Sequence, residues 1–232
     1  ITPILSGIAD YSGNKKTYMQ FFSCLGALSC ISFFFFDKVP LELGMVSVLF
    51  GSIGFSGSLV FYNAYLPEIA TPDLHDKVSA KGYSRGYIGA SLLLIVCLVL
   101  IQGFGMPAGY AFVLTGIWWI GFGQITFRGL PSNIYNHKPR GNNLIKGFDE
   151  LKKVWKELKP QKSLKRYLAA FFTYSMGVQT IMLMAVFFGT KEIALREGEM
   201  QTGLIISILV IQFIAVAGAY LMAFLSKKIG NI

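Results

Sequence analysis

The chain has 232 residues, of which 53% are hydrophobic and only 14% are charged. Ordinary soluble domains carry about 25% charged residues, so the composition argues against a soluble globular protein. The formal net charge of +9 would suit a nucleic-acid partner, but the positions of the basic residues indicate a different cause.

Six long apolar stretches follow one another along the chain, and the 21 basic and 12 acidic residues all lie outside them. A helix needs roughly 20 apolar residues to cross a hydrocarbon core about 30 Å thick. The sequence therefore predicts an all-α, polytopic transmembrane helical bundle, with residues 1–9 forming the end of one more span. The third stretch is short but reaches full length when it is extended back to Gly82. The stretches are 18–36, 43–66, 87–101, 108–127, 167–188 and 203–225.

The basic residues alternate between the connections that join these spans. Counted from the connection after residues 1–9, the odd-numbered connections hold 18 of the 21 basic residues. Loops rich in Lys and Arg stay on the cytoplasmic side of a membrane. The basic surplus is thus a topology signal, and we expect no nucleic-acid partner.

The longest polar stretch, residues 128–166, contains eleven of the basic residues. Within it, residues 142–159 have apolar side chains at a spacing of three and four, which predicts an amphipathic helix that ends before Pro160. Such a helix either braces two helical bundles or binds anionic headgroups at the membrane surface.

Short glycine series predict where helices pack closely, because small residues let helix backbones approach each other in lipid. One series is expected to face a neighbouring helix in the second span and the other in the third. The series are Gly51, Gly54, Gly57 and Gly82, Gly86, Gly89.

Metal and cofactor chemistry has no sequence support. The three cysteines lie inside apolar spans at spacings that fit neither a zinc site nor a disulfide framework, so packing is their expected role. The complete spans contain no acid, histidine or nucleophile–base set, and we expect neither an enzyme nor a cofactor. Because the chain opens in the middle of an apolar segment, we expect it to be a piece of a longer protein.

The segment around Asp10 resembles the loop between the second and third helices of the major facilitator superfamily, through Gly7, Ala9, Asp10, Gly13, Lys15 and Lys16. Residues 60–70 (VFYNAYLPEIA), residues 78–89, Trp118-Trp119 and residues 177–180 resemble one branch of that superfamily. This branch contains the fungal vacuolar amino-acid effluxer linked to autophagy and its bacterial relatives.

This resemblance implies a partial major facilitator fold with about 6.5 of 12 helices. Residues 1–127 would be the N-terminal half from the end of helix 2 to helix 6. Residues 128–166 would be a cytoplasmic linker, and residues 167–232 would begin the C-terminal half with helices 7 and 8.

The resemblance also implies a function: secondary active transport of a small polar solute by alternating access, with amino-acid efflux as the best estimate. The partners would be the lipid bilayer, the small-molecule substrate, and protons or another coupling ion. In a bacterium the location would be the plasma (inner) membrane. The alternative is a non-transporting scaffold that recruits a partner or anionic lipid through the amphipathic helix.

Residues expected to gate the cytoplasmic side lie near the span ends. Arg85 either pairs with Asp10 or Glu68 or extends to lipid headgroups. The loop residues would act as a latch in the family, or form an ordinary tight turn. The predicted gating set is Gly7, Asp10, Gly13, Lys15, Lys16, Glu68 and Arg85.

Substrate contacts are expected from uncharged polar side chains, because no charged residue lies deep in a complete span. The same side chains could instead form hydrogen bonds between helices, which average about 0.6 kcal/mol in membranes. The predicted substrate-facing set is Tyr62, Asn63, Tyr174, Gln179, Thr180 and Gln212.

Overall fold

A computed structural model describes residues 14–131, 152–191 and 200–229 of the chain. These residues form helices and short connections, with no strand among them. Six helices in this part of the chain are long and apolar enough to cross a membrane, which confirms the predicted all-α polytopic class. The elements are α2 (Lys15–Ser32), η1 (Phe33–Lys38), α3 (Leu41–Asn63), α4 (Leu66–Ile69), η2 (Pro72–Leu74), α5 (His75–Leu98), η3 (Val99–Gly103), α6 (Gly109–Gly129), α8 (Lys162–Lys191) and α9 (Met200–Ile229).

The third span begins earlier than its hydrophobic pattern predicts. Helix α5 starts at His75, seven residues before Gly82, and its first turns include charged residues. The span ends in a π-helix, η3, and then turns through Gly105, whose φ of +68° favours glycine. The Met106 N–H closes this turn by donating to the Leu100 carbonyl oxygen at 3.0 Å.

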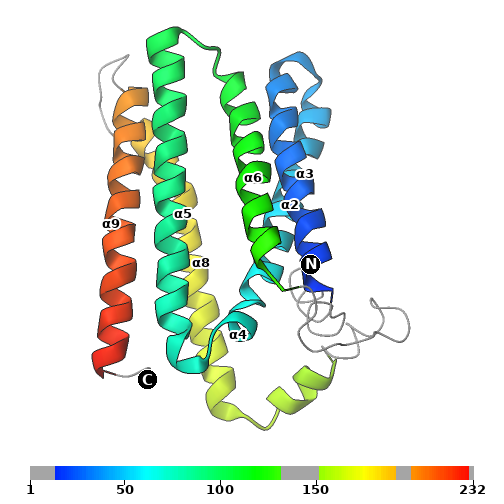
Figure 1. Cartoon of the computed structure of the whole chain (residues 1–232), viewed down its shortest axis with the longest axis vertical. Helices are drawn as coiled ribbons and strands as arrows, with labels where there is room; N and C mark the ends of the chain where they lie inside the picture. Colours follow the sequence, from blue (N-terminus) through cyan, green and yellow to red (C-terminus); the bar gives the residue numbers. More distant parts are fainter. Residues whose placement is uncertain (1–13, 132–151, 192–199, 230–232) are drawn as a thin grey trace.

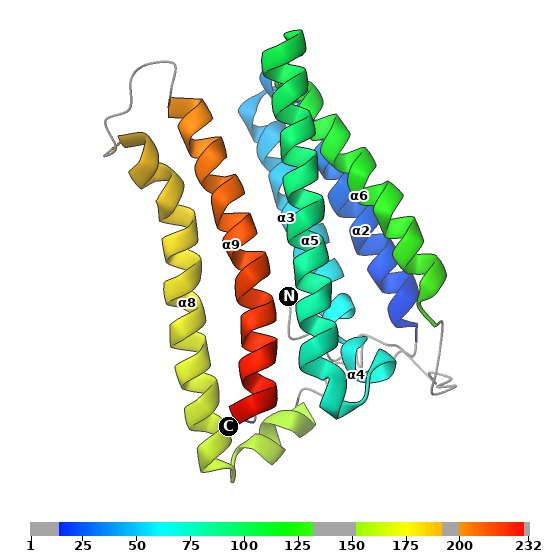
Figure 2. The same ribbon diagram turned by 60° about the vertical axis from the view of Figure 1, so that its left-hand side comes forward.

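The helices run up and down in alternation and form two groups (Figures 1 and 2). In the first group, α2 packs extensively against both α3 and α6. In the second group, α5 packs along α9. Helix α8 makes few contacts with α9, and its described side chains are almost all exposed.

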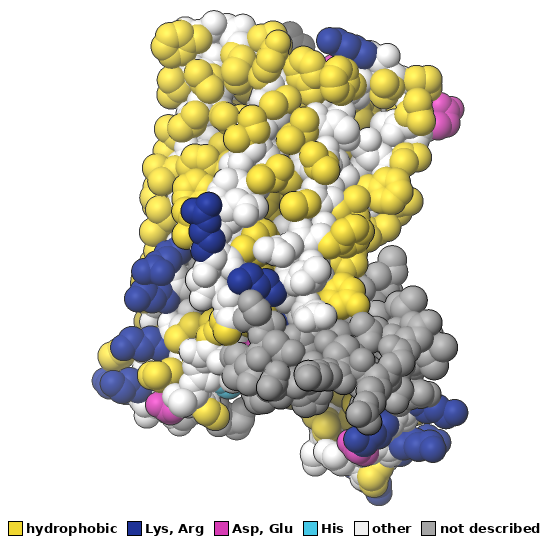
Figure 3. Space-filling view, turned by 45° about the vertical axis from the view of Figure 1, so that its right-hand side comes forward, with side chains coloured by type: hydrophobic (Ala, Val, Ile, Leu, Met, Phe, Trp, Pro, Cys, Tyr) yellow, Lys and Arg dark blue, Asp and Glu magenta, His cyan; other side chains and the backbone are white. Residues whose placement is uncertain are grey.

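One end of the bundle collects the predicted cytoplasmic connections. It is formed by the starts of α2, α5 and α8 and by the ends of α3, α6 and α9, and we call it the basic end (Figure 1). Figure 3 shows that Lys and Arg side chains gather toward this end, below a mostly hydrophobic surface. The arrangement agrees with the alternation of charge along the sequence.

Glycines set the spacing inside the first group. A Cβ atom added to Gly54 would lie 2.6 Å from Gly26 Cα, so the backbones of α2 and α3 touch there. A Cβ atom on Gly116 would lie 2.7 Å from the Ala27 carbonyl oxygen, which gives α6 an equally close approach to α2. The predicted packing role is confirmed for Gly54, and also for Gly57, which lies against the Phe22 ring.

The second predicted glycine series is wrong for two of its three members. Cβ atoms added to Gly86 and Gly89 would meet no described atom within 4 Å. Only Gly82 has a close neighbour, because its Cβ would lie 2.9 Å from the Tyr62 hydroxyl oxygen. The spacing of the series identifies a smooth helix face but does not reveal whether another helix covers it.

The predicted amphipathic helix is described only in part. Residues 152–158 are helical and lie at the basic end, with Val154 and Trp155 exposed. The earlier part of the predicted 142–159 helix lies outside the described residues.

Candidate functional site

An ion pair at the basic end joins α2 to the segment after α3. Lys15 Nζ lies 2.6 Å from Glu68 Oε1, and the two side chains are only 14% and 8% exposed. Lys15 Nζ is also 3.5 Å from the Ala64 carbonyl oxygen at the end of α3. An ion pair so shielded from water is stronger than one at the surface, because solvent screens it less.

Two further hydrogen bonds attach the end of α6. Lys16 Nζ donates to the Leu130 carbonyl oxygen at 3.0 Å, and the Tyr65 hydroxyl donates to the Pro131 carbonyl oxygen at 3.2 Å. Together with the Lys15–Glu68 pair, these contacts form what we call the clasp. Its four side chains are Lys15, Lys16, Tyr65 and Glu68.

The clasp suits the local electrostatics of the helices that it joins. Helices α3 and α6 both end at the basic end, where their last carbonyl groups carry partial negative charge. Ammonium groups placed near these carbonyls satisfy them and are attracted by the helix dipoles. Beneath the clasp, Met19, Phe61, Tyr65 and Phe127 form a buried cluster that ties the same three helices together.

The structure brings together three of the predicted gating residues: Lys15, Lys16 and Glu68. It corrects one predicted pairing, because Glu68 binds Lys15 instead of Arg85, and Arg85 is exposed on α5. Gly7, Asp10 and Gly13 lie outside the described residues.

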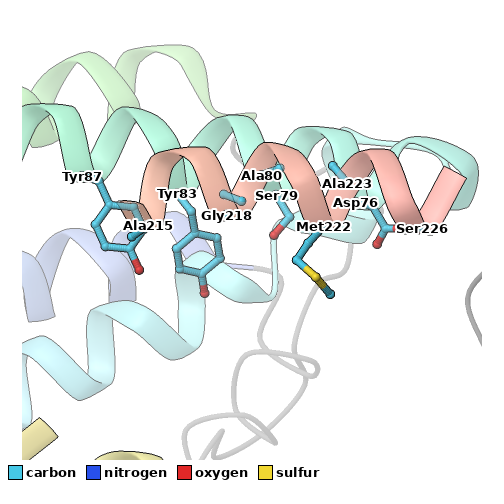
Figure 4. Close-up of a pocket in the computed structure, with 11 residues that line it drawn as sticks. Asp76, Ser79, Ala80, Tyr83, Tyr87, Ala215, Gly218, Met222, Ala223 and Ser226 are labelled. Atoms are coloured by element: carbon cyan, nitrogen blue, oxygen red, sulfur yellow. The ribbon is translucent and has the colours of Figure 1, made fainter. Parts of the chain in front are cut away.

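A groove of about 420 Å³ runs between α5 and α9, near the basic end. Figure 4 shows its longer side chains pointing to the same side of the two helices. The lining from α5 is Asp76, Ser79, Ala80, Tyr83 and Tyr87, and the lining from α9 is Ala215, Gly218, Ala219, Met222, Ala223 and Ser226.

Two polar contacts cross the interface that contains this groove. Near the basic end, the Ser226 hydroxyl on α9 donates to Asp76 Oδ2 on α5. Farther along, Ser91 Oγ lies 2.9 Å from Gln212 Oε1. The small side chains of α9 leave room for the two tyrosine rings of α5, so the interface is hollow where the rings project.

Two of the predicted substrate-facing residues lie beside this interface. Gln212 bonds to Ser91 within it, and Tyr62 on α3 places its hydroxyl against Gly82 of α5. The other four line no part of the groove and have exposed side chains. Of these, Thr180 donates to the Met176 carbonyl oxygen of its own helix at 2.8 Å, while the remaining residues are Asn63, Tyr174 and Gln179.

The whole chain, residues 1–232, matches the family described as "Vacuole effluxer Atg22 like". The chain belongs to this family.

Individual relatives agree with the assignment to this Atg22-like family. The MFS-type transporter YxiO of Bacillus subtilis, named as uncharacterized, is 32% identical over 200 residues, which cover 81% of this chain and 46% of YxiO. Autophagy-related protein 22-2 of Aspergillus oryzae is 22% identical over 308 aligned residues, covering 97% of this chain and 50% of that protein. The chain spans about half the length of the curated relatives that it matches. No solved structure matches the chain.

Sequence reasoning missed the polar lining of the groove in this Atg22-like chain. Asp76 stands among the basic residues at the start of α5 and reads as part of a charged connection. The signal that could have found the groove is periodic: Asp76, Ser79, Tyr83 and Tyr87 are spaced by three and four residues, which places them on one helix face. No group of three or more His, Cys, Asp or Glu residues able to hold a metal ion occurs in the part of the chain that the structure describes.

Proposed function

We propose that this chain is part of a secondary active transporter that moves a small polar solute, specifically an amino acid, by alternating access. The support comes from membership of the Atg22-like family and from the similarity to an MFS-type transporter. In such proteins two helical halves rock about a central site.

The observation that carries the proposal is the contrast between the two helix groups. Around α2 the backbones touch, and the clasp holds the ends of the helices together. Between α5 and α9 the contact is lined by small side chains and contains an open groove. A tightly packed body that meets its neighbour across a smooth, hollow interface can move as a unit, whereas a uniformly packed bundle resists such movement.

On this proposal the basic end faces the cytoplasm, following the rule for positively charged loops. The predicted loop residues Gly7, Asp10 and Gly13 would precede the clasp in the sequence and act with Lys15, Lys16 and Glu68 at the cytoplasmic gate. The clasp would keep α2, α3 and α6 together while the interface between α5 and α9 changes.

Exchange in proteoliposomes tests the proposal directly. The full-length protein is reconstituted and loaded with unlabelled leucine, and uptake of labelled leucine, alanine, glutamate and lysine is measured. We expect accelerated exchange of neutral amino acids compared with protein-free vesicles. Folded protein that exchanges none of the panel would contradict the amino-acid assignment and favour the scaffold alternative.

A further inference from the structure

The charge and the shape of the groove between α5 and α9 indicate what it can bind. Asp76 supplies the only formal charge among the eleven lining residues. The other polar groups are the hydroxyls of Ser79, Tyr83, Tyr87 and Ser226, which can all accept hydrogen bonds. A groove with this lining attracts a donor-bearing cation and disfavours an anion.

The two ends of the groove differ in chemistry. Asp76 and Ser226 meet at the end nearest the basic end, where the carboxylate is exposed to solvent. Toward Tyr87 the lining becomes aromatic and apolar, with Tyr83, Met222 and the small residues of α9. Tyr83 is seven residues from Asp76, or about 10 Å along a helix that rises 1.5 Å per residue. A ligand that spans both regions therefore needs a cationic head and an apolar body.

A bare metal ion fits this groove poorly. Calcium takes six to eight oxygen ligands, and magnesium demands a nearly octahedral set. The lining offers a single carboxylate, and the remaining oxygens belong to hydroxyls spread along the two helices. The volume of about 420 Å³ also lies within the range typical of small-molecule sites.

We propose that this groove binds small organic ammonium compounds, with the ammonium group at Asp76 and an apolar substituent along Tyr83 and Met222. Tyrosine rings attract cations as well as apolar groups, so Tyr83 suits the part of the ligand next to the charged head. As a site for the amino group of the transported solute, the groove rests on the proposed transport function. The binding itself can be measured without transport.

Three analogues of one size separate the contribution of the ammonium group. Leucine has both charged groups, isopentylamine lacks the carboxylate, and 4-methylpentanoate lacks the amine. Their binding to the full-length protein is measured by calorimetry in phosphate buffer, which contains no competing amine. We expect leucine and isopentylamine to bind and 4-methylpentanoate not to bind.

Matched variants identify the residue responsible. Asp76→Asn should weaken isopentylamine binding about ten-fold or more, because a charge-assisted hydrogen bond is lost. Asp73→Asn removes the same charge three residues earlier, outside the groove lining, and should change affinity by less than about two-fold. Asp76→Glu keeps the charge and should retain measurable binding, which controls for a folding defect in Asp76→Asn. Tyr83→Ala should weaken isopentylamine more than methylammonium.

Equal binding to wild type and Asp76→Asn, or preference for 4-methylpentanoate, would overturn the inference. Leucine exchange measured on the same preparation separates the two proposals. Exchange without any effect of Asp76→Asn on binding removes the ammonium site alone. Amine binding through Asp76 without exchange removes the transport proposal and leaves the site in place.

Discussion

The close crossing of α2 and α3 predicts that Gly54→Ala destabilises the bundle. The added Cβ would lie 2.6 Å from Gly26 Cα and 2.8 Å from the Phe22 carbonyl oxygen. Both are backbone atoms, so no side chain can rotate out of the way. Non-bonded carbon atoms prefer a separation of about 3.5–4.0 Å, and the two helices must therefore separate by about 1 Å.

Gly86→Ala is the matched control for this substitution. It makes the same chemical change inside a helix, but its Cβ would meet no described atom within 4 Å. Both variants gain the higher helix propensity of alanine, about 1 kcal/mol, so this term cancels between them. The remaining difference is the overpacking cost of Gly54→Ala, which we expect to be about 1–3 kcal/mol.

Thermal unfolding of the two variants in detergent measures this difference. For a chain of this size, each kcal/mol shifts Tm by about 2–4 °C, so Gly54→Ala should melt about 2–12 °C below Gly86→Ala. Size-exclusion chromatography before heating checks that both variants start folded. Equal melting temperatures would refute the argument that backbone contact at this position sets the distance between α2 and α3.

The remaining predictions concern the clasp and one proposed substrate contact. Glu68→Gln should slow transport and destabilise the protein by about 1–3 kcal/mol, because it leaves the half-buried Lys15 ammonium without its carboxylate; the exchanged pair Lys15→Glu with Glu68→Lys should recover part of both losses in the same flux and melting assays. Asn63→Leu should abolish amino-acid exchange in proteoliposomes while leaving Tm within about 1 kcal/mol of wild type, since the Asn63 side chain is exposed. Full exchange by that variant would remove Asn63 from the proposed pathway.

Hydrophobic length predicted the spans well because crossing a membrane is a local requirement. Each helix must satisfy its own backbone in lipid, whatever its neighbours are. The start of α5 escaped this reasoning. Its first turns carry Asp76, Lys77 and Lys81 at the basic end, and such residues are compatible with a helix that extends beyond the hydrocarbon core.

Contacts between distant segments were much harder to predict from the sequence. Glu68 had a basic candidate in Arg85, yet it pairs with Lys15, which is 53 residues away in the chain. The choice depends on how α2 and α3 cross, and that follows from the touching backbones of Gly26 and Gly54. The groove was missed for the same reason, because its two walls, α5 and α9, are separated by the whole central linker.

The contact between Ser91 and Gln212 has a consequence for the order of synthesis. The two residues are 121 positions apart, so a ribosome adding about 5–20 residues per second makes Gln212 some 6–24 s after Ser91. During this interval α5 lies in the membrane before α9 exists. Ser91 Oγ also lies 2.9 Å from the Tyr87 carbonyl oxygen of its own helix. The hydroxyl can thus stay bonded within α5 until α9 is inserted, and newly made α5 can wait in lipid without an unsatisfied Ser91.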